Sequence, residues 1–153
     1  MQEEILIKLY QYCAYQDRCT QEVLDKMKEL EVEIDEYDNY LAHLEDERFL
    51  DDARFVTSYV RGKFYHKSWG RQKIRHELKR RNVPLSMIEA GLREEIPEED
   101  YLEKAYQLAI KKWDQTSDGD RFARREKVAR YMVQKGYEFA AFQETLDELL
   151  KQG

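Results

Sequence analysis

Apolar residues recur with the same spacing at three places along the chain. Each occurrence has five apolar or aromatic positions separated by steps of four, five, five and four residues. The three sets are Val23, Met27, Val32, Tyr37 and Leu41; Ile74, Leu78, Val83, Ile88 and Leu92; and Val128, Met132, Tyr137, Phe142 and Leu146. Such residues make up only 42% of the sequence, so a match at all fifteen positions indicates three copies of one helical unit.

The spacing within each set predicts two helices joined by a tight corner. Residues four apart lie on one face of a helix, whereas the five-residue steps on either side of Val83 break the helical period. Asn82 and Gly136 directly precede the corner residue in the second and third sets. Both residue types readily adopt the left-handed conformation that ends a helix. Glu31 has this place in the first set, a departure that weakens the predicted boundary there.

A further helix precedes each predicted pair. Pro84 and Pro97 fall at joints, where a proline at the first helical position costs no hydrogen bond. The polar segment 115–120 is typical of a loop. The additional helices are expected at about residues 5–15, 53–65 and 98–113.

The chain is therefore predicted to be all-α, an elongated and curved array of three tandem three-helix modules. The module boundaries are expected at residues 1–50, 51–96 and 97–153. Tandem helical modules usually present a long surface to a large partner, and a slender stack leaves little room for an enclosed catalytic pocket. We expect a binding protein rather than an enzyme, with no catalytic residue, no metal and no cofactor.

Charge is distributed unevenly over these modules. The net charge is −6, but residues 1–52 carry 5 basic and 16 acidic residues, or −11. Residues 53–97 carry 11 basic and 4 acidic residues, or +7, and residues 98–153 carry 10 and 12, or −2. Because positive charge attracts phosphates and acidic protein surfaces, the central module is the expected binding region.

The candidate binding residues are basic side chains of the second and third modules. Taking the face of Ile74 as buried, His76 and three cations (Lys73, Lys79 and Arg80) point away from it, Arg75 lies on the flank, and Arg71 and Arg81 lie near the core side. The repeat alignment places Arg125 and Lys127 at the positions of Arg71 and Lys73, but an acid, Glu22, at the position of Lys73 in the first module. The full candidate set is Arg61, Lys63, Lys67, Arg71, Lys73, Arg75, Lys79, Arg80, Arg81, Arg125 and Lys127.

Two interpretations of this basic surface remain open. It is either a binding surface or a solvated face that keeps a thin protein soluble. Trp69, which opens the same helix with Gly70, is either a packing anchor or a platform on which a base stacks.

Several segments resemble one known family. Residues 51–60, DDARFVTSYV, resemble the D-D-x-R-F-A-x-x-Y/F-V segment of the RecX family, and residues 69–78, WGRQKIRHEL, resemble its G-x-x-K/R-I-x-x-E-L segment. The apolar spacing of residues 83–92 fits the same pattern, and residues 22–27, EVLDKM, are similar to E-L-x-x-K-L. Val56, Cys19 and the acidic first module depart from the family pattern.

The resemblance implies a regulator of the RecA recombinase. Members of this family are stacks of three-helix modules that lie in the groove of the RecA filament on single-stranded DNA. They bridge RecA subunits, depress ATP hydrolysis and strand exchange, and favour filament disassembly. The implied partners are the RecA filament and single-stranded DNA, bound directly or through RecA.

Two other function classes fit the sequence less well. A helix-turn-helix duplex binder would read bases with residues 85–92, which contain no Arg, Lys, Asn or Gln, the side chains best suited to base edges. A small enzyme would need a catalytic motif, and the acid pair Asp51 and Asp52 is better explained by its place at a helix N-terminus. Cys13 and Cys19 match no metal or disulfide pattern and are expected to be reduced and packed.

The sequence also bears on location. It contains no apolar run long enough to span a membrane and begins without a secretory signal pattern, so we expect a cytoplasmic protein. No coiled-coil seam is present, which favours a monomer.

Overall fold

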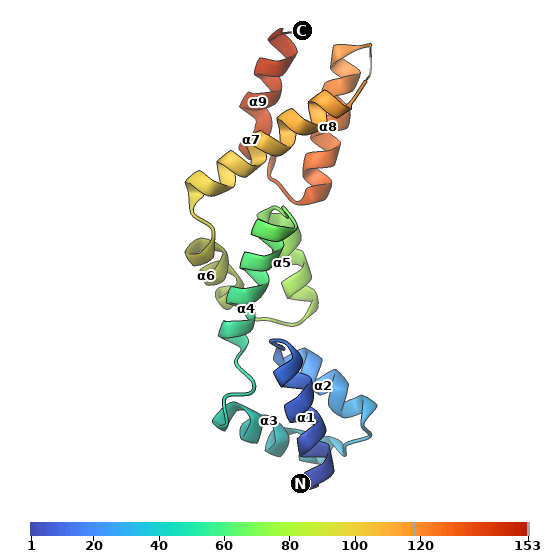
Figure 1. The fold of residues 1–153 in the computed structure, drawn as a ribbon, viewed down its shortest axis with the longest axis vertical. Helices are drawn as coiled ribbons and strands as arrows, with labels where there is room; N and C mark the ends of the chain where they lie inside the picture. The colour runs from blue at the N-terminus through green and yellow to red at the C-terminus, as the bar shows by residue number, and fades with distance from the viewer. Residues whose placement is uncertain (118, 153) are drawn as a thin grey trace. The chain divides into compact units, whose positions relative to one another are not determined.

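The structure, a computed structural model, describes residues 1–117 and 119–152 and is helical without strands in that part of the chain (Figure 1). The α-helices are α1 (Glu3–Tyr15), α2 (Thr20–Glu29), α3 (Tyr37–Asp46), α4 (Asp52–Arg61), α5 (Arg71–Arg80), α6 (Leu85–Glu95), α7 (Glu98–Gln115), α8 (Arg121–Lys135) and α9 (Phe139–Gln152). A 3₁₀ turn, η1 (Ile34–Glu36), precedes α3, and a π-helical turn, η2 (Gly62–His66), extends α4. The all-α prediction is confirmed.

The helices expected outside the three pairs are present as α1, α4 with η2, and α7. A loop was expected at residues 115–120. In the structure, α7 ends at Gln115 and α8 begins at Arg121. Asp118, which belongs to that loop prediction, lies outside the described residues.

The chain divides into two compact units. One unit comprises residues 1–59 and 78–91, and the other comprises residues 60–77 and the chain from Leu92 onward. The division passes through the sequences of α4, α5 and α6. The module boundaries at residues 50 and 96 therefore stay predictions.

Each unit has its own apolar core. In the first unit, α1, α2 and α3 pack together and bury Leu9, Cys13, Val23, Met27, Val32, Tyr40, Leu44 and Leu50. In the second unit, α8 and α9 pack on α7 and on each other, as Figure 1 shows. Their buried side chains are Tyr101, Ala105, Ala109, Trp113, Val128, Met132, Tyr137, Phe142 and Leu146.

The repeated apolar pattern marks buried positions, with one correction. Thirteen of the fifteen positions are buried, whereas Tyr37 and Leu41 are only half-buried. The spacing predicted that Tyr37 and Leu41 would be buried. Tyr40 and Leu44, three residues further along, occupy those core positions instead. The reason is η1, whose three residues lengthen the connection between the corner and α3.

The three predicted corners share one backbone geometry. Glu31, Asn82 and Gly136 have positive φ values of 60°, 57° and 103°. In each case the next residue donates its N–H to the carbonyl five positions earlier: Val32 to Met27 at 2.9 Å, Val83 to Leu78 at 3.2 Å and Tyr137 to Met132 at 3.0 Å. This is the Schellman arrangement of a helix end. The prediction for Asn82 and Gly136 is confirmed, and Glu31 adopts the same conformation despite its side chain.

Candidate nucleic-acid interface

The N-terminus of α5 is joined to the C-terminus of α8 through two glycines. The Gly70 N–H donates to the Lys135 carbonyl at 2.7 Å, and the Gln72 N–H donates to the Gly136 carbonyl at 2.9 Å. A Cβ on Gly70 would lie 2.3 Å from the Gly136 carbonyl carbon, so only glycine permits this approach. Amide groups that could bind a phosphate at a helix N-terminus are therefore already used by backbone carbonyls.

Tyr101 closes the same junction from α7. Its hydroxyl accepts the Arg71 N–H at 3.0 Å and donates to Glu138 at 2.7 Å. Burial, and secondly the hydrogen bond to Glu138, raise the pKa of this phenol, which therefore stays neutral and can donate. The Arg71 guanidinium lies 3.8 Å from the Tyr101 ring centre and pairs with Glu98. Arg71 thus has a structural role at this junction.

Lysines gather around the half-buried Trp69, beside this junction. The Lys73 ammonium lies 4.4 Å from the Trp69 ring centre, and the Lys63 ammonium lies 4.7 Å from it. Lys135 donates to the Lys67 carbonyl at 2.9 Å, and its pKa is lowered by burial and secondly by the charge of Lys73. We call Lys63, Lys73 and Lys135 the lysine cluster. Trp69 contacts two lysines of its own chain, and its two interpretations stay predictions. Lys73 is half-buried rather than pointing away from the protein.

Lys135 was absent from the candidates drawn from the sequence. It directly precedes Gly136, just as Arg81 directly precedes Asn82. The repeat alignment that pairs Arg71 with Arg125 also pairs Arg81 with Lys135, and could have identified it. The concentration of like charge in the lysine cluster favours an anionic ligand, because repulsion among the ammonium groups is relieved when an anion binds.

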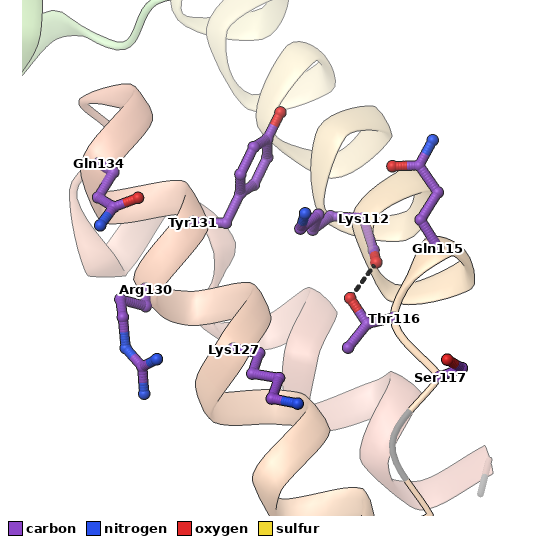
Figure 2. A pocket seen from close by; sticks show the side chains of 8 residues that line it. All are labelled: Lys112, Gln115, Thr116, Ser117, Lys127, Arg130, Tyr131 and Gln134. Atoms are coloured by element: carbon purple, nitrogen blue, oxygen red, sulfur yellow. Dashed lines mark hydrogen bonds between the residues drawn. The ribbon is translucent and has the colours of Figure 1, made fainter.

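A second basic surface is an open groove of about 590 Å³ between α7, the segment that follows it, and α8 (Figure 2). The Lys112 ammonium lies 4.7 Å from the Tyr131 ring centre, and these two side chains face each other from α7 and α8 (Figure 2). The Thr116 hydroxyl donates to the Lys112 carbonyl at 2.7 Å, which holds the turn at the end of α7. The described lining comprises three cations, a tyrosine, amides and hydroxyls, and no carboxylate: Lys112, Gln115, Thr116, Ser117, Lys127, Arg130, Tyr131 and Gln134. We call this the α7–α8 groove.

The remaining candidate cations differ in their surroundings. Arg61 pairs with Glu95 at 3.5 Å, and Arg125 pairs with Asp147 at 2.7 Å, so both are engaged within the chain. The Arg81 guanidinium lies 5.0 Å from the Tyr59 ring centre. Arg75 is half-buried and donates to Gln72 at 2.7 Å. The exposed candidates are Arg61, Lys67, Lys79, Arg80 and Lys127.

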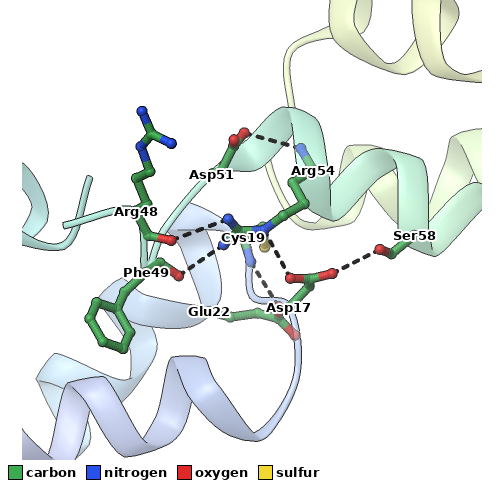
Figure 3. Close-up of polar contacts among 8 residues, drawn as sticks. All are labelled: Asp17, Cys19, Glu22, Arg48, Phe49, Asp51, Arg54 and Ser58. Carbon is green, nitrogen blue, oxygen red and sulfur yellow. Dashed lines mark hydrogen bonds and ion pairs between the residues drawn. The ribbon is translucent and has the colours of Figure 1, made fainter. Parts of the chain in front are cut away.

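The segment that begins Asp51-Asp52 forms a structural clamp (Figure 3). Asp51 accepts the Arg54 N–H at 3.1 Å and so caps α4. The Arg54 guanidinium donates to Asp17 at 3.1 Å and to the carbonyls of Arg48 and Phe49 at 3.1 and 3.3 Å. These bonds attach the start of α4 to α1–α2 and to the end of α3. The capping interpretation of Asp51 is confirmed.

Asp52 forms hydrogen bonds with the N-terminus of the neighbouring helix, α2. Its two carboxylate oxygens accept the backbone N–H and the hydroxyl of Thr20, each at 2.7 Å, at the N-terminus of α2, where a negative charge is favourable. Among the described residues, no group of His, Cys, Asp and Glu side chains is arranged to hold a metal ion. Cys13 and Cys19 are buried free thiols, as expected.

Comparison with known proteins gives consistent matches. Models of the second and third three-helix domains of RecX match residues 51–92 and 98–146. The regulatory protein RecX of Prosthecochloris aestuarii is 30% identical over 139 residues, covering 91% of this chain and 89% of that protein. The regulatory protein RecX of Oceanobacillus iheyensis is 28% identical over 141 residues, covering 90% of this chain but only 52% of that protein.

Solved structures agree with these matches. A crystal structure of a regulatory protein RecX has a TM-score of 0.81 at 25% identity, covering 94% of this chain and 72% of that chain. A crystal structure of RecX from Lactobacillus salivarius has a TM-score of 0.82 at 23% identity, covering 97% and 98% of the two chains, and shows the same fold.

Proposed function

The chain belongs to the RecX family of regulatory proteins, and on this basis we propose that it regulates the RecA recombinase. In this proposal the partner is the RecA filament on single-stranded DNA. The protein binds in the filament groove, depresses ATP hydrolysis and strand exchange, and favours disassembly. It acts as a cytoplasmic monomer, without a catalytic residue or a cofactor.

The observation that carries the proposal is the gathering of cations with aromatic rings in residues 60–77 and 92–152. Lys63 and Lys73 of the lysine cluster lie against the Trp69 ring, and the α7–α8 groove combines three cations with Tyr131. Phosphates and acidic protein surfaces are both drawn to such sites, and both are available in a nucleoprotein filament. Within residues 1–117 and 119–152, no helix has the length and apolarity needed to cross a bilayer.

The candidate cations divide into two roles in this proposal. Arg61, Arg71 and Arg125 are ion-paired within the chain and position the helices. Arg75, which donates to Gln72, and Arg81, which lies against the Tyr59 ring, are half-buried and are likewise given a structural role. The filament contacts are assigned to Lys63, Lys67, Lys73, Lys79, Arg80 and Lys127, together with Lys112, Arg130 and Lys135, which the structure adds.

The proposal is tested by RecA-catalysed ATP hydrolysis on single-stranded DNA. The test variant carries Lys67→Glu, Lys127→Glu and Arg130→Glu, all at exposed positions, the last two in the α7–α8 groove. The control carries Lys28→Glu, Lys111→Glu and Lys151→Glu, the same change in net charge at exposed positions elsewhere. The test variant should require about tenfold more protein than wild type to lower the rate, since electrostatic attraction commonly changes association by about that factor or more. The control should resemble wild type.

Two results would overturn the proposal. If the wild-type protein leaves ATP hydrolysis by RecA unchanged at saturating concentration, it has no regulatory activity of the proposed kind. If the test and control variants are weakened equally, the effect depends only on net charge, and the assignment of the binding surface is wrong.

A further inference from the structure

The acidic N-terminal region, residues 1–52, contains an electropositive groove of its own. Residues 1–52 carry only 5 basic residues. Three of them line one open groove of about 310 Å³, and the lining contains no carboxylate: Lys8, Gln11, Tyr12, Tyr15, Arg18, Lys26 and Leu30. We call this the α1–α2 groove. The net charge of −11 therefore hides a local surface of opposite sign.

Contacts within the groove hold its cations against tyrosine rings. The Arg18 guanidinium lies 3.7 Å from the Tyr12 ring centre and 5.9 Å from that of Tyr15, and its Nε donates to the Tyr12 carbonyl at 3.0 Å. The Lys26 ammonium lies 5.4 Å from the Tyr12 ring centre and also pairs with Glu29 at 3.3 Å. Arg18 is thus positioned by a ring face and a backbone oxygen, a geometry that leaves other donors of its guanidinium for a ligand.

Tyr15 provides a different kind of surface. It lies at the last residue of α1 and exposes 81% of its surface, although a tyrosine gains stability when its ring is buried. Single exposed aromatic residues are ordinary. This one adjoins three cations in one groove, which is the combination of π face and positive charge used to hold nucleic acid strands.

We propose that the α1–α2 groove binds single-stranded nucleic acid directly. A base stacks on Tyr15, and the flanking phosphates contact Lys8, Arg18 and Lys26. The carboxylates of an acidic protein segment would use the cations alone, whereas a nucleic acid strand supplies both phosphates for the cations and a base for the ring, so the tyrosine favours a nucleic acid. The proposal goes beyond regulation of RecA, because it assigns direct strand binding to the module that the sequence marks as least suited to it.

The test measures binding of the full chain to a fluorescent oligodeoxythymidylate, without RecA. Tyr15→Ala should weaken binding at least about fivefold, the effect of losing one base stack. Lys8→Ala should weaken binding and reduce the slope of log affinity against log salt concentration by about 0.7, the value for one phosphate contact on a single strand. Lys28→Ala is the control, since Lys28 is exposed on α2 outside the groove lining. An iodouracil-substituted strand should crosslink to Tyr15, located by mass spectrometry.

Defined results would overturn this proposal. The proposal is wrong if Tyr15→Ala binds the oligonucleotide as tightly as wild type, or if no crosslink to Tyr15 forms. It is also wrong if Lys8→Ala and Lys28→Ala lose the same amount of affinity for the oligonucleotide. If Lys8→Ala weakens binding of an oligoglutamate peptide but leaves binding of the oligonucleotide unchanged, the groove binds an acidic protein instead. Because RecA is absent from the assay, its outcome is independent of the ATP hydrolysis test.

Discussion

Replacing Gly70 with alanine tests the glycine junction between α5 and α8. The added Cβ would lie 2.3 Å from the Gly136 carbonyl carbon, 2.4 Å from its oxygen and 2.6 Å from the Tyr137 nitrogen. These are backbone atoms, so no side-chain rotation relieves the overlap. The two segments must separate, which lengthens or breaks the bonds from Gly70 to Lys135 and from Gln72 to Gly136.

The expected loss follows from these two effects. Overpacking of a well-packed site costs about 1–3 kcal/mol. The two backbone hydrogen bonds contribute about 1 kcal/mol each. Gly70→Ala should therefore lower the free energy of unfolding by about 3–5 kcal/mol, measured by chemical denaturation. Hydrogen exchange should also accelerate at the Gln72 amide, because that N–H loses its acceptor.

Gly62→Ala is the matched control. A Cβ on Gly62 would meet nothing within 4 Å, so this variant should keep its stability or gain up to about 1 kcal/mol. A difference of less than about 1 kcal/mol between the two variants, with unchanged exchange at Gln72, would refute the close-approach argument.

Two further predictions concern residues of the first compact unit. Glu31→Gly should raise the free energy of unfolding by about 0.5–1 kcal/mol, because glycine removes the cost of a positive φ at Glu31. Glu29→Gly, at the last residue of α2, should lower it by up to about 1 kcal/mol, because glycine is a poor helix former and the pair with Lys26 is lost. Thermal unfolding that shows both variants destabilised alike would contradict this. Burial raises the pKa of Cys19 from 9.0 to about 11, so stability from the neutral thiol is present below pH 9 and is lost as the pH rises from 9 to 11. The fall in stability over that range should be smaller in Cys19→Ala than in wild type, and an equal fall would exclude this thiol as the cause.

The helical units were predictable because their information is local. The steps of four residues place apolar side chains on one helix face, and Asn82 and Gly136 mark the corners by their backbone preferences. The first of the three repeated sets of apolar residues shows the limit of this local information. Tyr37 with Leu41 and Tyr40 with Leu44 are both apolar pairs at helical spacing, and the spacing does not tell which pair is buried. The turn η1 decides it by lengthening the connection.

The candidate interface was predictable only in part. The excess of cations in the central region is evident from composition. Three of the candidates drawn from the sequence belong to the surfaces described above: Lys63 and Lys73 from that region, and Lys127 from the C-terminal part of the chain. The partners of the other cations are distant in sequence. Arg71 meets Glu98, and Arg125 meets Asp147, and no periodicity relates these positions. Lys112 and Arg130 likewise become groove residues only because α7 and α8 pack side by side.

The helices, their corners and the regional excess of charge follow from the order of amino acids, since each depends on residues within a few positions of one another. The packing of the folded chain sets which cations are neutralised, which rings stay exposed, and that Lys8, Arg18 and Lys26 share a groove within the acidic residues 1–52. Electrostatic attraction and ring contacts depend on distance through space, and packing alone sets that distance between residues far apart in the chain.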